Sequence, residues 1–143
     1  SFTKLIFNMA TTTARLLLDS AAGSLLTSVL AIDDTATLTQ LGTATGLEKT
    51  TGLARQTFSA ATETQLINAS NYTAAKAHKL YIKNTDTSGT DTVKLTSGTI
   101  GDVKSIGYLD PDDWALIPFG GENDINVTCT SATTIVEWML IFE

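Results

Sequence analysis

The sequence predicts a mostly β protein, an antiparallel β-sandwich of the jelly-roll type, preceded by an N-terminal helix and an extended Thr/Gly-rich arm. Three observations lead to this fold class. Of the 143 residues, 26 are threonines, and threonine is β-branched and suits a pleated strand. The second half of the chain alternates apolar and polar residues, and turn-forming clusters interrupt it at regular spacing. About seven short strands without intervening helices are typical of an antiparallel sandwich or barrel.

The strands are expected in the second half of the chain. They span residues 79–83, 92–96, 100–109, 114–119, 125–130 and 133–142. A turn-forming run at residues 86–89 follows the first of them, which predicts that the first two pair as a hairpin. Ser97 and Gly98 are expected to end that hairpin, and a proline among three aspartates predicts a turn at residues 110–113.

The last strand is unusual because both of its faces are apolar. One face carries Val136, Trp138, Leu140 and Phe142, and the other carries Ile135, Glu137, Met139 and Ile141. A strand with one solvated face should alternate more cleanly. Two explanations are open: the strand lies centrally under covering elements, or its second face contacts a partner.

The N-terminal region predicts one short helix. Leu25, Leu26, Val29 and Leu30 form one helical stripe, with Asp19 or Ser20 as its N-cap. Gly23 opposes the helix by roughly 1 kcal/mol relative to alanine.

Residues 33–62 are rich in Thr, Ala and Gly and are expected to form an extended arm. Five large apolar residues are its anchors, Leu38, Leu41, Leu47, Leu53 and Phe58. They are too few to bury thirty residues, because backbone ordering costs about 1–2 kcal/mol per residue. We therefore expect the arm to dock on another surface, such as a neighbouring subunit. The expected organisation is an N-terminal helix and arm over residues 1–62 and a β-sandwich domain over residues 63–143.

Composition argues against several kinds of partner. The net charge is −6, and the nine basic residues are spread singly along the chain. Binding to nucleic acid needs clustered Lys and Arg, so we expect no nucleic-acid partner. The longest apolar run, residues 138–142, is far shorter than a membrane span, so we expect no membrane partner. The N-terminus shows no signal-peptide core, and the chain is expected to be made in the cytoplasm.

Few residues are candidates for chemistry. His78 and Cys129 are the only residues of their types, and both share the inward phase of their strands. We interpret both as core residues. The carboxylates of Asp110, Asp112, Asp113, Glu122 and Asp124 could in principle collect calcium, but their spacing is not that of an EF-hand. The sequence predicts no catalytic residue, no metal site and no cofactor, and hence no enzyme.

Residues 76–143 carry three motifs that resemble a known class of proteins. These are HKLYIKN at residues 78–84, GYLDPDDWALIP at residues 107–118 and VEWMLIF at residues 136–142. Together they resemble the small β-sandwich virion proteins of tailed bacteriophages. The resemblance implies a structural virion protein, of the capsid decoration (cement) type, that stabilises the head through protein–protein contacts.

The resemblance also implies partners and a location. The partners would be copies of the chain itself, with a homotrimer as the expected state, and the major capsid protein or other virion proteins. The location would be the virion. Two alternatives stay open: a tail-tube or head–tail joining component, and a cellular β-sandwich that binds a carbohydrate or another ligand through Trp114 beside the acidic turn.

Overall fold

A computed structural model describes residues 11–21, 30–87 and 89–143 of the chain. These residues are mostly β and fall into two compact units, Ser1–Glu48 and Lys49–Glu143. Every pair of neighbouring strands is antiparallel. The mostly β, antiparallel prediction is therefore confirmed for the described residues.

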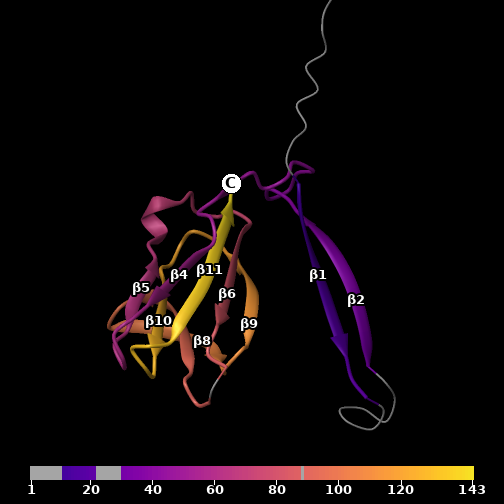
Figure 1. The fold of residues 1–143 in the computed structure, drawn as a ribbon. Helices are drawn as coiled ribbons and strands as arrows, with labels where there is room; N and C mark the ends of the chain where they lie inside the picture. The colour runs from indigo at the N-terminus through magenta and orange to yellow at the C-terminus, as the bar shows by residue number, and fades with distance from the viewer. Residues whose placement is uncertain (1–10, 22–29, 88) are drawn as a thin grey trace, which may run out of the picture. The chain divides into compact units, whose positions relative to one another are not determined.

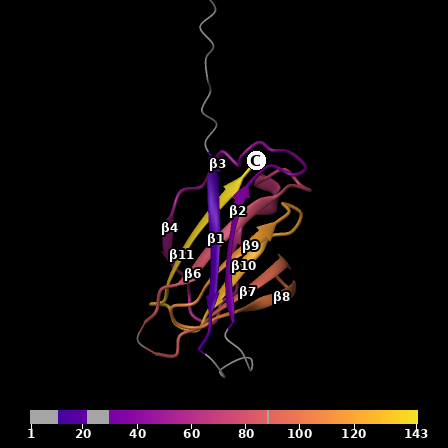
Figure 2. The ribbon, with the colours of Figure 1, turned by 90° about the vertical axis from the view of Figure 1, so that its right-hand side faces the viewer.

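The second unit contains two sheets that share one core (Figures 1 and 2). The first, which we name the β11 sheet, contains β3 (Lys49–Thr50), β4 (Ala54–Thr57), β11 (Ile135–Phe142), β6 (His78–Asn84) and β9 (Trp114–Phe119). The second, which we name the β10 sheet, contains β5 (Thr64–Ile67), β10 (Ile125–Cys129), β7 (Val93–Thr99) and β8 (Asp102–Leu109). A short 3-10 helix, η1 (Ala69–Asn71), follows β5. The arrangement is sandwich-like.

Period-two alternation builds the core of this unit. Leu80 and Ile82 point inward from β6, and Leu140 points inward from the neighbouring β11. Val93 and Val127 point inward from the other sheet, and all five side chains are 3% exposed or less. Burial of each such side chain stabilises the fold by about 1.5–3 kcal/mol.

The predicted hairpin between residues 79–83 and 92–96 is wrong. Both strands form, as β6 and β7, but they lie in different sheets. The partner of β7 along the chain is β8, and Gly101 in the tight turn between them has a φ of 101°. Gly98, which was expected to end the strand, lies inside β7 with a φ of 120°. A side chain there would collide with the carbonyl of Asp102, since a Cβ would lie 2.8 Å from that oxygen.

The last strand is central, which supports the first of its two explanations. β11 pairs with β6 on one side and with β3 and β4 on the other. Its inward face is buried in the core. On its second face Glu137 and Ile141 are 8% and 7% exposed, whereas Ile135 is 41% exposed. The second face is therefore only partly covered.

The first unit contains a β-hairpin. Its strands β1 (Thr12–Asp19) and β2 (Ala31–Leu38) pair over their full length. Arg15 on β1 forms a forked ion pair with Asp33 on β2, with both N–O distances at 2.6 Å. The Asp33 hydrogen bonds raise the pKa of Arg15, and the same bonds lower the pKa of Asp33.

The predicted N-terminal helix is not borne out. Asp19, one expected N-cap, is the last residue of β1, and the backbone N–H of Ser20 donates to the Leu30 carbonyl at 2.9 Å. The hairpin ladder thus continues where the helix should begin. Three residues of the predicted stripe, Leu25, Leu26 and Val29, lie outside the described residues.

Residues 33–62 do not form one extended arm. The first six belong to β2, and later residues form β3 and β4, which pair with β11 of the same chain. Phe58 packs in the core of the second unit. The division between the two compact units follows residue 48, whereas the division expected from the sequence follows residue 62. Backbone pairing to β11 supplies the stabilisation that the scattered anchors could not.

Candidate functional site

His78 is a core residue whose ring nitrogens are both hydrogen-bonded. It is 0% exposed, and Nδ1 accepts from the backbone N–H of Glu143 at 3.1 Å. Nε2 must then carry the ring proton, and it donates to the Thr73 carbonyl at 2.9 Å. Tyr72, Phe119 and Phe142 surround the ring, with centroids 5.7–6.3 Å away. In this arrangement His78 joins the C-terminus to the loop before β6.

Cys129 lies on the inward face of β10 and is 0% exposed. It belongs to the core cluster together with Ile125 and Val127, in the phase that the sequence predicts. Burial raises the pKa of the thiol. A protonated, enclosed thiol is a poor nucleophile, so its position suits packing.

The acidic residues hold turns together instead of converging. Asp113 accepts from the backbone N–H of Asp110 at 3.0 Å, and Asp112 forms an ion pair with Lys83 at 2.8 Å. Asp124 accepts from Gln65 and from the backbone of Ala69, both at 2.8 Å. Within residues 11–21, 30–87 and 89–143, no group of three or more His, Cys, Asp or Glu residues could hold a metal ion.

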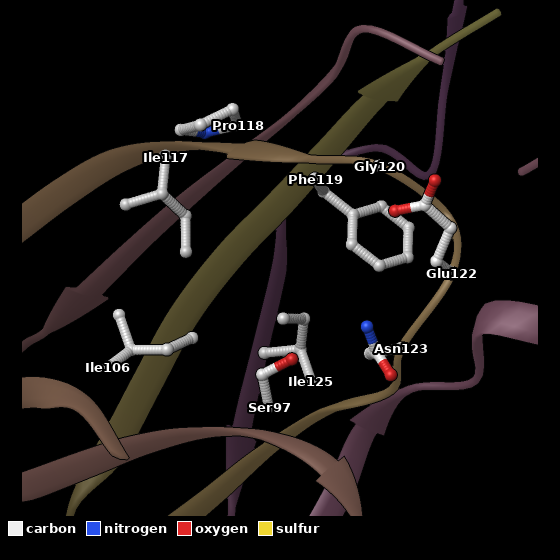
Figure 3. Close-up of a pocket in the computed structure, with 9 residues that line it drawn as sticks. All are labelled: Ser97, Ile106, Ile117, Pro118, Phe119, Gly120, Glu122, Asn123 and Ile125. Carbon is white, nitrogen blue, oxygen red and sulfur yellow. The ribbon is translucent and has the colours of Figure 1, made fainter. Parts of the chain in front are cut away.

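A pocket of about 360 Å³ opens in the second unit between the two sheets. Figure 3 shows Ile117 and Phe119 of β9 pointing towards Ile106 and Ile125, while Pro118 points away. Polar groups of Ser97, Glu122 and Asn123 complete the lining. The pocket is apolar with a few polar groups, which is a chemistry suited to an apolar side chain or small ligand.

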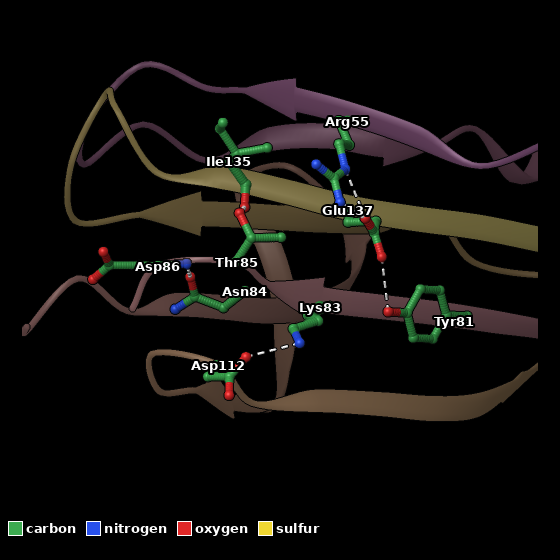
Figure 4. A network of polar contacts seen from close by, with 9 residues as sticks. All are labelled: Arg55, Tyr81, Lys83, Asn84, Thr85, Asp86, Asp112, Ile135 and Glu137. Carbon is green, nitrogen blue, oxygen red and sulfur yellow. Dashed lines mark hydrogen bonds and ion pairs between the residues drawn. The ribbon is translucent and has the colours of Figure 1, made fainter. Parts of the chain in front are cut away.

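A polar network crosses the outer face of the β11 sheet (Figure 4). Arg55 on β4 reaches Glu137 on β11, with Nη2 and Nε at 2.6 Å and 2.7 Å from Oε2. Tyr81 on β6 donates to the other carboxylate oxygen of Glu137 at 3.0 Å. The hydrogen bonds from Arg55 and then from Tyr81 lower the pKa of Glu137. The pKa of Tyr81 is raised mainly by its burial and secondly by its hydrogen bond to Glu137.

Large apolar side chains surround this network. Trp114 and Leu116 of β9 are 54% and 37% exposed, and Ile135 of β11 is 41% exposed. Met139 lies opposite Tyr81 and is partly buried. Tyr, Trp, Met and Arg are enriched in protein–protein interfaces. We call this surface the outer face. It comprises the polar network residues and the side chains around them, namely Arg55, Lys79, Tyr81, Lys83, Trp114, Leu116, Pro118, Ile135, Glu137, Met139 and Ile141.

Sequence reasoning found only part of the outer face. It singled out Trp114 and the second face of the last strand, but not Arg55 or Tyr81. One signal was present: Glu137 interrupts an otherwise apolar face and so needs a polar partner once it is buried. Its main partner, Arg55, lies 82 residues away in the chain, and the sequence alone does not show that the two residues are neighbours in the fold.

No family model matches this chain, and no curated protein or solved structure matches it significantly. Among the described residues, no helix has the length and hydropathy needed to cross a membrane.

Proposed function

We propose that this protein is a structural protein of a tailed-phage particle, of the capsid decoration type, which stabilises the head by protein–protein contacts. The proposal starts from the three motifs in residues 76–143 that resemble small virion β-sandwiches. On this proposal the chain is a structural subunit whose surfaces bind other proteins of the particle. Its expected partners are copies of itself and the major capsid protein.

Strand connectivity supports a jelly roll, a fold common in capsid proteins. Counting from β4 as the first strand, the eight main strands of the second unit run 1-8-3-6 in one sheet. In the other sheet they run 2-7-4-5. Apart from β7 and β8, successive strands therefore lie in opposite sheets, as in a strip of four antiparallel strand pairs rolled into a sandwich.

The β1–β2 hairpin is the observation that carries the proposal. Leu16, Leu17, Leu18 and Ile32 project from it and are 40–61% exposed. A two-stranded hairpin is marginally stable in water, and exposed apolar strands tend to associate. A subunit that covers this hairpin with a partner would remove both problems, and an assembling particle provides such a partner.

The test is electron microscopy of particles released by cells that carry the gene, labelled with gold-tagged antibody against residues 49–143. Label distributed over the heads supports the proposal. Label confined to the tail or the neck moves the chain to the tail-tube or head–tail alternative. Absence of the chain from every particle fraction, judged by mass spectrometry, refutes a virion role.

The pocket between the sheets favours one second candidate, a ligand-binding β-sandwich. Trp114 also stands exposed beside the acidic turn, as the sugar platform of such a module would. Glycan-array screening and calorimetric titration with the best hit would test it. Binding that survives Trp114→Ala and Ile106→Trp would exclude both places as the site.

A further inference from the structure

The central part of one face of the β1–β2 hairpin, from the Ala14–Ala36 pair to the Leu18–Ile32 pair, is apolar except for a single carboxylate. Directly opposed residues in an antiparallel pair share a face, so Leu16 and Leu18 share one with Asp34 and Ile32. The three apolar side chains are 40–43% exposed. The Asp34 carboxylate has no hydrogen bond or ion pair to any residue in the described part of the chain. This face therefore offers apolar surface and one unpaired negative charge.

The outer face of the β11 sheet offers the complement. Its middle row across the sheet is Met139, Tyr81 and Leu116, and the next row is Ile141, Lys79 and Pro118. The Lys79 ammonium donates to the Ala77 carbonyl at 3.1 Å. No carboxylate of the described residues lies within ion-pair distance of it, whereas Lys83 and Arg55 are paired with Asp112 and Glu137. Lys79 is thus the cation of this face that is open to a new partner.

We propose that the apolar face of the β1–β2 hairpin of one copy packs on the outer face of a second copy, with Asp34 opposite Lys79. This inference rests on the proposed function, because it names the surfaces through which copies assemble. Every copy carries both surfaces, so a second copy always supplies the complement.

The spacing of the two surfaces agrees. Residues on one face of a strand repeat every second position, about 6.6–6.8 Å apart, in both sheets. The Leu16–Asp34 pair is followed on its face by the Leu18–Ile32 pair. With Asp34 over the Lys79 row, Leu18 and Ile32 fall over the Tyr81 row. Apolar groups then meet apolar groups, and the two lone charges meet each other.

The test is a charge-swap cycle followed by analytical ultracentrifugation. Asp34→Lys sets two cations against each other, and Lys79→Asp sets two carboxylates against each other. Each should weaken self-association roughly tenfold or more, about 1.4 kcal/mol. The double variant restores the opposite charges and should recover most of the affinity. Asp19→Lys on the other hairpin face and Lys104→Asp on β8 are controls with the same charge changes, and they should leave association unchanged.

Circular dichroism of each variant shows whether it folds. If a charge-reversal variant does not fold, the neutral variant Asp34→Asn or Lys79→Gln replaces it. A wild-type chain that stays monomeric at all concentrations overturns the inference. Controls that weaken association equally, or a double variant without recovery, also overturn it. The inference is also overturned if the charge-swap variants change the Tm of a monomeric protein and leave self-association unchanged, since the contact would then lie within one chain. A monomeric chain together with gold-labelled heads would refute this contact but leave the proposed function intact. Self-association that follows the charge-swap cycle, together with absence of the chain from every particle fraction, would refute only the virion role.

Discussion

The two faces of β11 should respond very differently to truncation. Leu140 is 0% exposed in the core between the sheets, whereas Met139, the next residue back, lies on the outer face and is only partly buried. Removal of a buried leucine side chain loses its transfer free energy and leaves a cavity, at a cost of about 2–5 kcal/mol. Met139→Ala should cost roughly 1 kcal/mol, because its side chain is already partly in water.

Thermal and urea unfolding, followed by tryptophan fluorescence, measure this difference. Both tryptophans, Trp114 and Trp138, belong to the second unit and report on its unfolding. In a domain of this size 1 kcal/mol shifts Tm by about 4–8 °C. Leu140→Ala should thus lower Tm by on the order of 10–40 °C, and Met139→Ala by only about 4–8 °C. Equal losses, or a larger loss for Met139→Ala, would show that the inward phase assigned to β11 is wrong.

Three further predictions concern single residues of the second unit. Because the folded-state pKa of Glu137 is lowered by Arg55, its contribution to stability is present above its unfolded pKa and disappears as pH falls through the folded pKa; Glu137→Gln should flatten the acid limb of a stability–pH curve, and an unchanged limb would contradict the network. The Cys129 thiol should react with a disulfide reagent only after denaturation, since it is buried and its pKa is raised; fast labelling of native protein would contradict its placement. Gly98→Ala should destabilise by roughly 1–3 kcal/mol in urea titrations, because of the positive φ and the Asp102 carbonyl, and Gly89→Ala, which meets open space, is its control.

The strands of the second half and their inward faces could be predicted from sequence because both depend on local periodicity. Alternation placed His78 and Cys129 inward, and both are 0% exposed. β9 and β10 also form where turn residues and apolar runs predicted strands. Side chains of a strand alternate between faces whatever its partners are, so one segment contains this information.

Pairing partners could not be predicted in the same way. β6 and β7 follow each other with a turn-rich connection, yet β6 pairs with β9 and β11, far along the chain. The hydrophobic core decides this, because each strand buries its inner face only when the two sheets stack. The outer face followed from the same decision: Arg55 meets Glu137 only because β4 pairs with β11.

In the N-terminal region local pattern and structure disagree. Leucine spacing after Ser20 predicted a helix, and a run of thirty residues predicted an arm. Instead, β1 and β2 pair as a hairpin between Thr12 and Leu38, and β3 and β4 pair with β11 of the same chain. By itself the sequence determined the β class, the phase of the core strands and the burial of His78 and Cys129. Which strands are neighbours, and hence which side chains form the outer face, was decided only by the tertiary structure, because those contacts join residues far apart in the chain.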